Sequence, residues 1–167
     1  MLRLILLLNH LTAKIRLAEC GFKTTIRAPL CCSYKFIKIG TDSHIKHYGR
    51  IEAISKWNAS TFDPLLSIGS RVSIQQNVHI TFAGHLEIGD GCLIAPRVTI
   101  TDIHHSTTGD VSYPSDRKIT VRETKIGKGV FIGANAVVLP GTNIGDFATI
   151  GANQVVSGKI PCRTVVK

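Results

Sequence analysis

IGKGVFIGANAVVLPGTNIGDFATIGANQVVSGKIP, residues 126–161, carries an apolar side chain at every sixth position. These anchor positions are Ile126, Ile132, Val138, Ile144, Ile150 and Val156. Neither an α-helix, with about 3.6 residues per turn, nor an alternating strand has a period of six. A short strand followed by a corner does have it, if each unit forms one side of a three-sided coil. The stretch therefore predicts a solenoid with a column of Ile and Val at its centre, stabilised by stacking between neighbouring coils.

The same period continues upstream in shorter runs. The anchors are Ile68, Ile74, Ile80 and Leu86, then, after a slip of two residues, Ile88, Ile94 and Ile100, with a weaker early series at Ile39, Ile45 and Ile51. Accidental spacing in a Val/Ile-rich sandwich is the alternative, but so long a run in one register disfavours it. We predict an all-β chain with a β-helix domain over 37–167 and a short helical or irregular segment over 1–36.

The repeat lapses between Ile100 and Ile126, so the segment at about 101–124 is expected to leave the prism as a protruding loop. Long loops on rigid scaffolds often carry function. ITDIHHST, residues 100–107, places an acid and two adjacent histidines where this loop begins. These three side chains are candidate functional residues, and a solvated histidine pair is the plain alternative.

Composition restricts the class of protein and its partners. The 167 residues fit one domain, and the formal charge of +9 favours anionic partners. Aromatic residues make up only 6% and no dense run of Lys and Arg occurs, so nucleic acid is not expected as a partner. The five cysteines show no zinc-ligand spacing and are odd in number, which favours neither a zinc site nor a disulfide framework. We expect a cytoplasmic protein.

The N-terminal stretch MLRLILLLNHLTAKIRLAECGFKTTIR, residues 1–27, has an apolar start that Asn9 and His10 interrupt. This apolar start is far shorter than the roughly 20 apolar residues that span a bilayer. Lys14 and Arg16 follow too closely for a typical secretory signal. We interpret it as an amphipathic helix that packs on the domain or, alternatively, makes peripheral contact with the inner membrane.

IGSRVSIQQNVHI (residues 68–80), LEIGDGCLIAPRVTITDIHHS (residues 86–106) and the opening stretch together resemble the hexapeptide-repeat acyltransferases. Within that family the similarity is greatest to bacterial O-acetyltransferases of lipopolysaccharide and capsule sugars and to maltose and galactoside acetyltransferases. The resemblance implies a left-handed parallel β-helix that assembles as a homotrimer. It also implies transfer of an acetyl group from acetyl-CoA to a saccharide hydroxyl in surface polysaccharide biosynthesis, without a metal.

The resemblance also assigns site residues. The family's catalytic histidine lies five residues after the anchor that precedes the loop, which makes His105 the general base. Asp102 would orient the imidazole or, alternatively, close a turn, and His104 would lie near the acceptor or be a solvated neighbour. The remaining residues that the resemblance places near the acceptor are Gln75, Asn77 and Phe131. The two amides could equally form hydrogen-bond ladders along the coils, and the single tryptophan, Trp57, is expected to pack elsewhere.

For the acyl donor, the resemblance implies a groove between neighbouring prisms. The residues that would meet the pantetheine arm or the phosphates of acetyl-CoA are Gly133, Ala134, Gly151, Ala152, Lys159 and Arg163. Structural corners explain the glycines equally well.

Three other readings remain open. The enzyme could acetylate serine, an amine of a nucleotide-linked sugar, or an antibiotic. The chain could be a trimeric scaffold without catalysis. A γ-class carbonic anhydrase-like metalloenzyme shares the solenoid, but the downstream HxxxxH pair of that class does not occur here.

Overall fold

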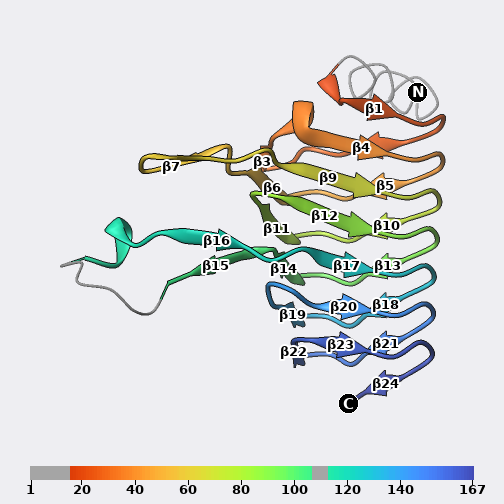
Figure 1. The fold of residues 1–167 in the computed structure, drawn as a ribbon. Coiled ribbons are helices and arrows are strands. Elements are labelled where there is room, and N and C mark those ends of the chain that lie inside the picture. Colours follow the sequence, from red (N-terminus) through yellow and green to blue (C-terminus); the bar gives the residue numbers. More distant parts are fainter. Residues whose placement is uncertain (1–15, 107–112) are drawn as a thin grey trace.

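The computed structural model describes residues 16–106 and 113–167. Parallel strands wind into a three-sided prism, a left-handed β-helix in which each coil contributes one short strand to each side (Figure 1). We name the sides faces A, B and C in the order in which the chain visits them. The fold class predicted from the period of six is confirmed. The helix expected near the N-terminus falls mainly on residues 1–15, outside the described residues.

The strands of the three faces follow one another along the prism axis. Face A contains β1 (Glu19–Cys20), β4 (Ile37–Ile39), β9 (Leu65–Ile68), β12 (His85–Ile88), β17 (Thr124–Ile126), β20 (Asn143–Ile144) and β23 (Lys159–Ile160). Face B contains β2 (Thr25–Ile26), β5 (His44–Ile45), β10 (Ser73–Ile74), β13 (Leu93–Ile94), β18 (Phe131–Ile132), β21 (Thr149–Ile150) and β24 (Val165–Val166). Face C contains β3 (Cys31–Cys32), β6 (Arg50–Ala53), β11 (His79–Phe82), β14 (Thr99–Thr101), β19 (Val137–Val138) and β22 (Val155–Val156).

The core is the predicted column of anchor side chains. On face A, Ile88 pairs with Ile68 above it and with Ile126 below it, and on face C Ile80 pairs with Ile100. All five are at most 4% exposed. Because burying one such side chain contributes roughly 1.5–3 kcal/mol, a column of like residues in register stabilises the prism coil by coil.

The β-helix begins earlier than residue 37. Strands β1, β2 and β3 pair in parallel with β4, β5 and β6, so they form a coil inside the segment that the sequence analysis assigned to a helical or irregular leader. Cys20, Ile26 and Cys32 occupy its anchor positions, again six residues apart. Two of these anchors are cysteines, which are small and apolar. A search for aliphatic residues at every sixth position does not count them. A single-turn 3-10 helix, η1 (Tyr34–Phe36), follows this coil.

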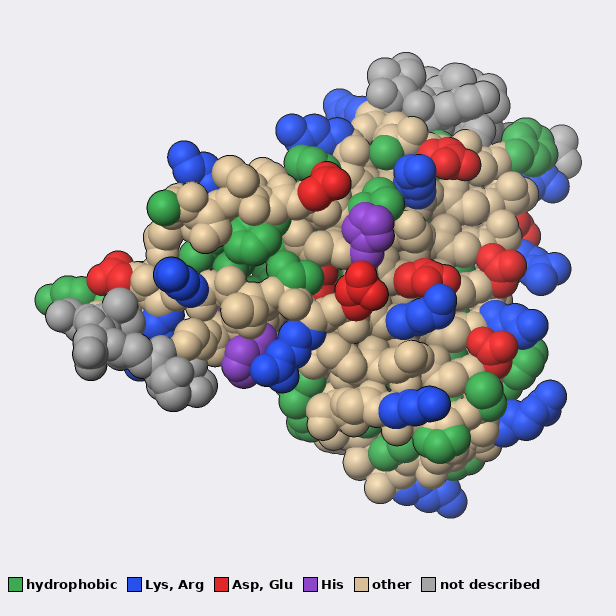
Figure 2. Space-filling model, in the orientation of Figure 1, with side chains coloured by type: hydrophobic (Ala, Val, Ile, Leu, Met, Phe, Trp, Pro, Cys, Tyr) green, Lys and Arg blue, Asp and Glu red, His purple; other side chains and the backbone are tan. Residues whose placement is uncertain are grey.

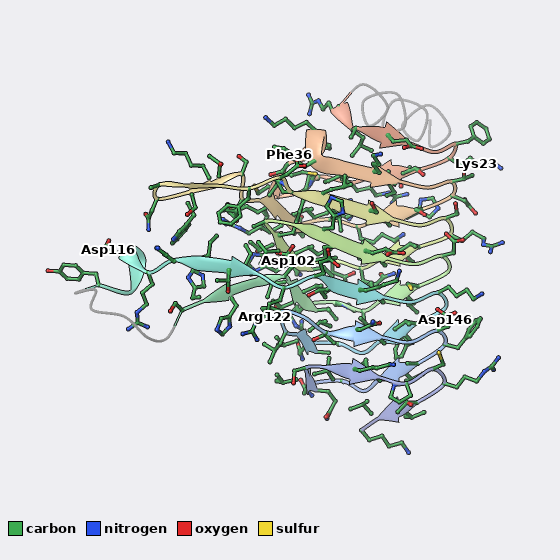
Figure 3. The ribbon with its side chains drawn as sticks, in the orientation of Figure 1. Lys23, Phe36, Asp102, Asp116, Arg122 and Asp146 are labelled. Carbon is green, nitrogen blue, oxygen red and sulfur yellow. The ribbon has the colours of Figure 1, made fainter. Side chains whose placement is uncertain are left out.

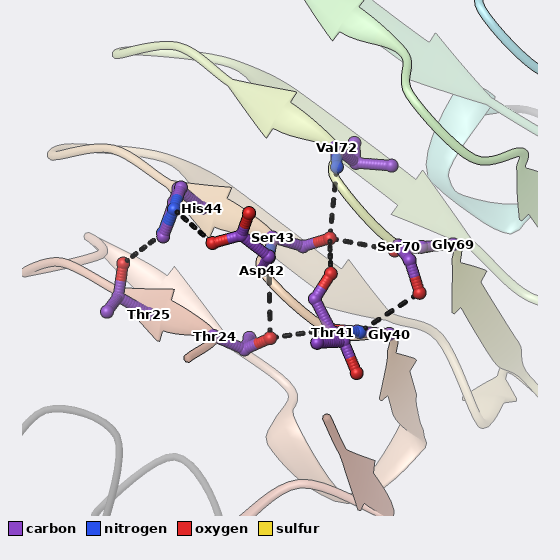
Figure 4. Close-up of polar contacts among 10 residues, drawn as sticks. All are labelled: Thr24, Thr25, Gly40, Thr41, Asp42, Ser43, His44, Gly69, Ser70 and Val72. Carbon is purple, nitrogen blue, oxygen red and sulfur yellow. Dashed lines mark hydrogen bonds and ion pairs between the residues drawn. The ribbon is translucent and has the colours of Figure 1, made fainter. Parts of the chain in front are cut away.

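Hydroxyl side chains tie successive coils together at the corner between faces A and B (Figure 4). The Ser43 hydroxyl donates to the Gly69 carbonyl at 2.8 Å and accepts from the Val72 amide at 3.0 Å. The Thr41 amide donates to the Ser70 hydroxyl at 3.1 Å. These bonds satisfy backbone groups that the tight corner leaves without a strand partner, which keeps neighbouring coils in register.

Two arms leave the prism at the corner between faces C and A (Figure 1). The first arm, residues 54–64, contains the hairpin β7 (Lys56–Trp57) and β8 (Ser60–Thr61). The second arm, residues 102–123, contains the antiparallel strands β15 (Ile103–His105) and β16 (Ile119–Val121) and the 3-10 helix η2 (Pro114–Asp116). The second arm is the loop predicted at about 101–124, whereas the first was not predicted.

Across residues 16–106 and 113–167, no helix is both long enough and apolar enough to cross a membrane.

Candidate functional site

A cleft of about 430 Å³ lies where the two arms meet face C. Strands of face C, the first arm and the second arm each supply part of its wall. The residues that line it are Arg50, Glu52, His79, Thr81, Ile54, Trp57, Ile103, His105 and Ile119. A volume of this size is within the range of small-molecule sites in proteins, roughly 300–1,000 Å³.

A small hydrophobic core separate from the central column supports the cleft. Its buried members are Ala83, Ile103 and Ile119, and Ile54, Trp57, Phe62 and Val121 pack against them. Figure 2 shows a hydrophobic region on the surface where the arms leave the prism. Both arms and the corner between β11 and β12 contribute to this core, so neither arm is held in place independently of the other.

Trp57 connects the two arms directly. Its indole Nε1–H donates to the Arg117 carbonyl of the second arm at 2.9 Å. The neighbouring Asn58 side-chain amide lies 3.4 Å from the carbonyls of Ser115 and Asp116. The indole ring also meets the His105 imidazole nearly at right angles, with 5.6 Å between the ring centroids. Trp57 therefore packs away from Phe131, as expected, but it does so in the cleft and against the candidate base.

The two adjacent histidines lie on opposite sides of β15. Side chains alternate along a strand, so His105 shares a side with Ile103 and both line the cleft. His104 projects from the other side and is not among the described residues that line it. Its backbone carbonyl accepts a long hydrogen bond from the Thr120 hydroxyl, at 3.4 Å. Of the predicted pair, only His105 is placed to act in the cleft.

Asp102 lies at the root of the second arm and is fully buried (Figure 3). Its Oδ1 accepts from the Ala83 amide and its Oδ2 from the Gly84 amide, both at 2.9 Å. Burial raises the pKa of this carboxyl, and the hydrogen bonds from the two amides and the charge of His85 act in the opposite direction. The carboxylate thus joins the arm to the corner of the preceding coil. Within the described residues Asp102 makes no hydrogen bond to the His105 imidazole, and its two oxygens bond to the amides of the preceding corner instead.

Polar side chains from β6 and β11 form the floor of the cleft. Glu52 Oε2 lies 2.7 Å from Arg50 Nη2 and 2.9 Å from Arg50 Nε. His79 Nε2 and the Thr81 hydroxyl share a hydrogen bond of 2.8 Å. Sequence reasoning did not assign these four residues to the site. The pairing register of the strands could have revealed them. Each of the four residues is next to an anchor residue of face C, and β6 pairs directly with β11.

The other predicted acceptor residues lie elsewhere in the chain. Gln75 and Asn77 occupy the corner between faces B and C, where the Gln75 amide donates to the Ser73 hydroxyl at 2.9 Å. Asn77 has a left-handed backbone conformation with φ 58°, which asparagine tolerates well. Phe131 lies on face B beside Leu93 and is 39% exposed. Within one chain these residues do not join the described lining of the cleft.

The residues predicted to bind the acyl donor separate into two groups. Gly133, Ala134, Gly151 and Ala152 follow β18 and β21 and stack at the corner between faces B and C. A Cβ on Gly133 would lie 2.5 Å from the Ala152 nitrogen, so close stacking of the coils already requires this glycine. The corner therefore offers backbone and little side-chain bulk along its edge.

Lys159 and Arg163 form the second group. Lys159 projects from β23 on face A, where it pairs with Asn143. Arg163 lies at the corner between faces A and B, with its guanidinium 5.1 Å above the Phe147 ring. The fold therefore does not bring these two cations to the corner that carries Gly133 and Gly151 in the same chain.

Among the residues that the structure describes, no three His, Cys, Asp or Glu side chains are close enough together to hold a metal ion.

Comparison with known proteins agrees with the repeats and the prism. Residues 123–157 match the family model described as the hexapeptide repeat of succinyl-transferase. The match covers coils near the end of the chain, and together with the repeat of six it agrees with the left-handed β-helix class of the fold.

Two Escherichia coli proteins are among its relatives. One is the putative lipopolysaccharide biosynthesis O-acetyl transferase WbbJ, 36% identical over 109 residues, which cover 61% of this chain and 56% of the relative. The other is galactoside O-acetyltransferase, 36% identical over 112 residues, which cover 59% of this chain and 51% of the relative. The chain spans about half the length of these two relatives.

A solved structure shares the fold over most of the chain. It is AntD, an N-acyltransferase from Bacillus cereus in complex with dTDP and 3-hydroxybutyryl-CoA. The TM-score is 0.74, the sequence identity is 18%, and the match covers 92% of this chain and 80% of AntD.

Proposed function

We propose that the protein is an O-acetyltransferase that transfers an acetyl group from acetyl-CoA to a hydroxyl of a saccharide, in surface polysaccharide biosynthesis. Of two relatives at 36% identity, one is a putative lipopolysaccharide biosynthesis O-acetyl transferase and the other is a galactoside O-acetyltransferase. The observation that carries the proposal is His105, a side chain that can accept a proton, in a cleft of about 430 Å³ bounded by two arms.

His105 acts as the general base in this proposal. Its imidazole accepts the proton of the acceptor hydroxyl while the hydroxyl oxygen forms a bond to the thioester carbonyl carbon. The carbon–sulfur bond then breaks, and the departing CoA thiolate takes the proton back from the imidazolium. A positioned base of this kind typically contributes roughly 10²–10⁴-fold to the rate. Trp57 and the small core beneath the cleft hold the imidazole in place.

We propose a homotrimer whose contacts lie on faces B and C. The apolar side chains exposed on these faces are Leu93, Phe131 and Val165 on face B and Val155 on face C, between 39% and 63% exposed. They lie on either side of the corner that carries Gly133 and Gly151. Large exposed apolar side chains that gather beside one edge are typical of an interface between subunits. In this arrangement the acyl donor lies along that corner, in the groove between two prisms.

The cytoplasm is the proposed compartment. The thiols of Cys31, Cys32, Cys92 and Cys162 form no disulfide in the described part of the chain, as a reducing compartment favours. Peripheral contact of residues 1–15 with the inner membrane stays a prediction, since these residues lie outside the described part of the chain.

Three measurements on the wild-type protein test the proposal. Calorimetry with acetyl-CoA should give saturable binding, and incubation with acetyl-CoA and a panel of saccharides should yield a sugar heavier by one acetyl group, with one free CoA thiol per sugar modified. Sedimentation should give a particle three times the 18.1 kDa chain mass. A folded protein that binds no acetyl-CoA would instead favour the scaffold reading.

A further inference from the structure

We propose that the cleft between the two arms is the acceptor site and that it takes an uncharged pyranose ring, with Trp57 as its aromatic wall and the Arg50–Glu52 pair as its hydroxyl-binding wall. The inference rests on the proposed acetyl transfer and names the acceptor class of that same site.

The aromatic wall is Trp57. Its Nε1–H is bonded to the Arg117 carbonyl, so the indole is fixed in orientation while its ring remains part of the cleft lining. An indole presents a large, rigid apolar surface, which suits the C–H face of a pyranose. The centroid of the His105 imidazole is 5.6 Å from that of the indole, so a sugar that rests against one ring has its hydroxyls within reach of the other. Phe131, which the resemblance places near the acceptor, lies on face B of the same chain.

The polar wall is the ion pair of β6. Arg50 uses Nε and one terminal nitrogen towards Glu52, and a guanidinium carries five N–H donors, so donors remain for sugar hydroxyls. Glu52 is acceptor-only when ionised, and its carboxylate can receive a hydroxyl hydrogen bond as well as those from Arg50. Together the pair offers both kinds of partner that a hydroxyl needs.

Charge balance in the cleft decides between neutral and acidic sugars. Arg50 and Glu52 have opposite charges and lie 2.7 Å apart, so the pair carries no net charge. Apart from these two residues, the described lining consists of Thr81, His79, His105 and apolar side chains. An acidic sugar would face the Glu52 carboxylate without a cation of its own, whereas a neutral pyranose meets matched donors and acceptors. The site therefore favours an uncharged ring.

The fluorescence of the protein reports on this cleft directly, because Trp57 is the one tryptophan of the chain. The test titrates the wild-type protein with the methyl glycosides of glucose, galactose and mannose, and with methyl glucuronide as the charged counterpart of the first. We expect a saturable change in emission with at least one neutral glycoside and a much weaker response to the glucuronide. In Glu52→Gln the same titration should saturate at about tenfold higher sugar concentration.

Steady-state kinetics provides the second readout. Trp57→Phe and Trp57→Ala should raise KM for the acceptor, by about tenfold in Trp57→Ala, while KM for acetyl-CoA stays unchanged, since an aromatic contact contributes roughly 0.5–1.5 kcal/mol. Phe22→Leu, an aromatic substitution at a surface position 67% exposed in the first coil, is the matched control. Circular dichroism verifies that each variant is folded.

The outcomes separate the inference from the function on which it rests. If the wild type binds a neutral glycoside but forms no acetylated sugar, the proposed acetyl transfer fails and the sugar site stands. If acetylated sugar is formed but no glycoside changes the emission, or the Trp57 and Glu52 variants keep the wild-type KM for the acceptor, the assignment of the cleft is overturned while the proposed function stands.

Discussion

Trp57 of the first arm and His105 of the second arm meet edge to face, with ring centroids 5.6 Å apart and an interplanar angle of 78°. The two residues come from two separate interruptions of the repeat, and each arm alone would leave its ring without this partner. The hydrogen bond from Trp57 to the Arg117 carbonyl and the buried Ile103 and Ile119 hold the arms at this spacing. The position of the candidate base therefore depends on both arms.

The contact should be visible in the fluorescence of Trp57. An imidazole edge against an indole changes the surroundings of the ring, so removal of the His105 side chain should shift the emission of Trp57. In His104→Ala the emission should stay that of the wild type, because His104 projects from the opposite side of β15. Identical emission spectra for the wild type and His105→Ala would contradict the contact.

Removal of the Asp102 carboxylate should destabilise the root of the second arm. Asp102→Ala leaves the amides of Ala83 and Gly84 without their acceptors, and each buried donor left unpaired costs roughly 1–3 kcal/mol. We expect a loss of about 3 kcal/mol in the free energy of unfolding, measured with urea. Asp116→Ala, at the exposed end of the same arm, should change it by less than about 0.5 kcal/mol. Equal stability of the two variants would be incompatible with the role assigned to Asp102.

The glycines at the corner of faces B and C should matter for stacking even without acetyl-CoA. In Gly133→Ala the new Cβ would lie 2.5 Å from a backbone nitrogen of the next coil, so two coils must separate, at a cost of about 3 kcal/mol. Gly91→Ala places its Cβ in open space at φ 67°. Arg71 and Phe147 already adopt that conformation at equivalent corners, so we expect a loss of only about 1 kcal/mol there. Thermal unfolding without ligand measures both, and a smaller loss for Gly133→Ala than for Gly91→Ala would refute the stacking argument.

The cysteines should differ sharply in reactivity. Burial raises the pKa of Cys92 to about 11 and that of Cys32 to about 12, whereas Cys162 is exposed. At pH 8 only about one Cys92 thiol in a thousand is ionised, so iodoacetamide should label Cys162 and spare Cys92 and Cys32 in the folded protein. Because folding raises the pKa of Cys92 above 9.0, its contribution to stability is complete below that value and is lost as the pH rises towards 11. Peptide mass spectrometry reads the labelling, and equal labelling of Cys92 and Cys162 would contradict the burial.

The sequence predicted the prism because its core depends on local spacing alone. Ile126 to Val156 define the register of the last coils without any knowledge of distant contacts. The first coil was missed because Cys20 and Cys32 stand at anchor positions, and the first arm was missed because residues 54–64 carry no motif of their own.

The candidate site was predictable only in part for the same physical reason. His105 follows from its distance to the anchor Ile100. Asp102 bonds to amides of another coil, and Trp57 approaches His105 from another arm. Such contacts between distant segments cannot be predicted from the spacing of residues within one stretch. Phe131 faces another side of the prism because strands six residues apart belong to different faces.

The central claim is that His105 is the base for acetyl transfer, and the most direct test compares His105→Ala with His104→Ala in an assay of acetyl-CoA consumption with a saccharide acceptor. We predict that His105→Ala loses about 10²–10⁴-fold in kcat while it keeps the trimer and acetyl-CoA binding, and that His104→Ala stays within about twofold of the wild type. Full activity in His105→Ala, or an equal loss in both variants, would contradict the account.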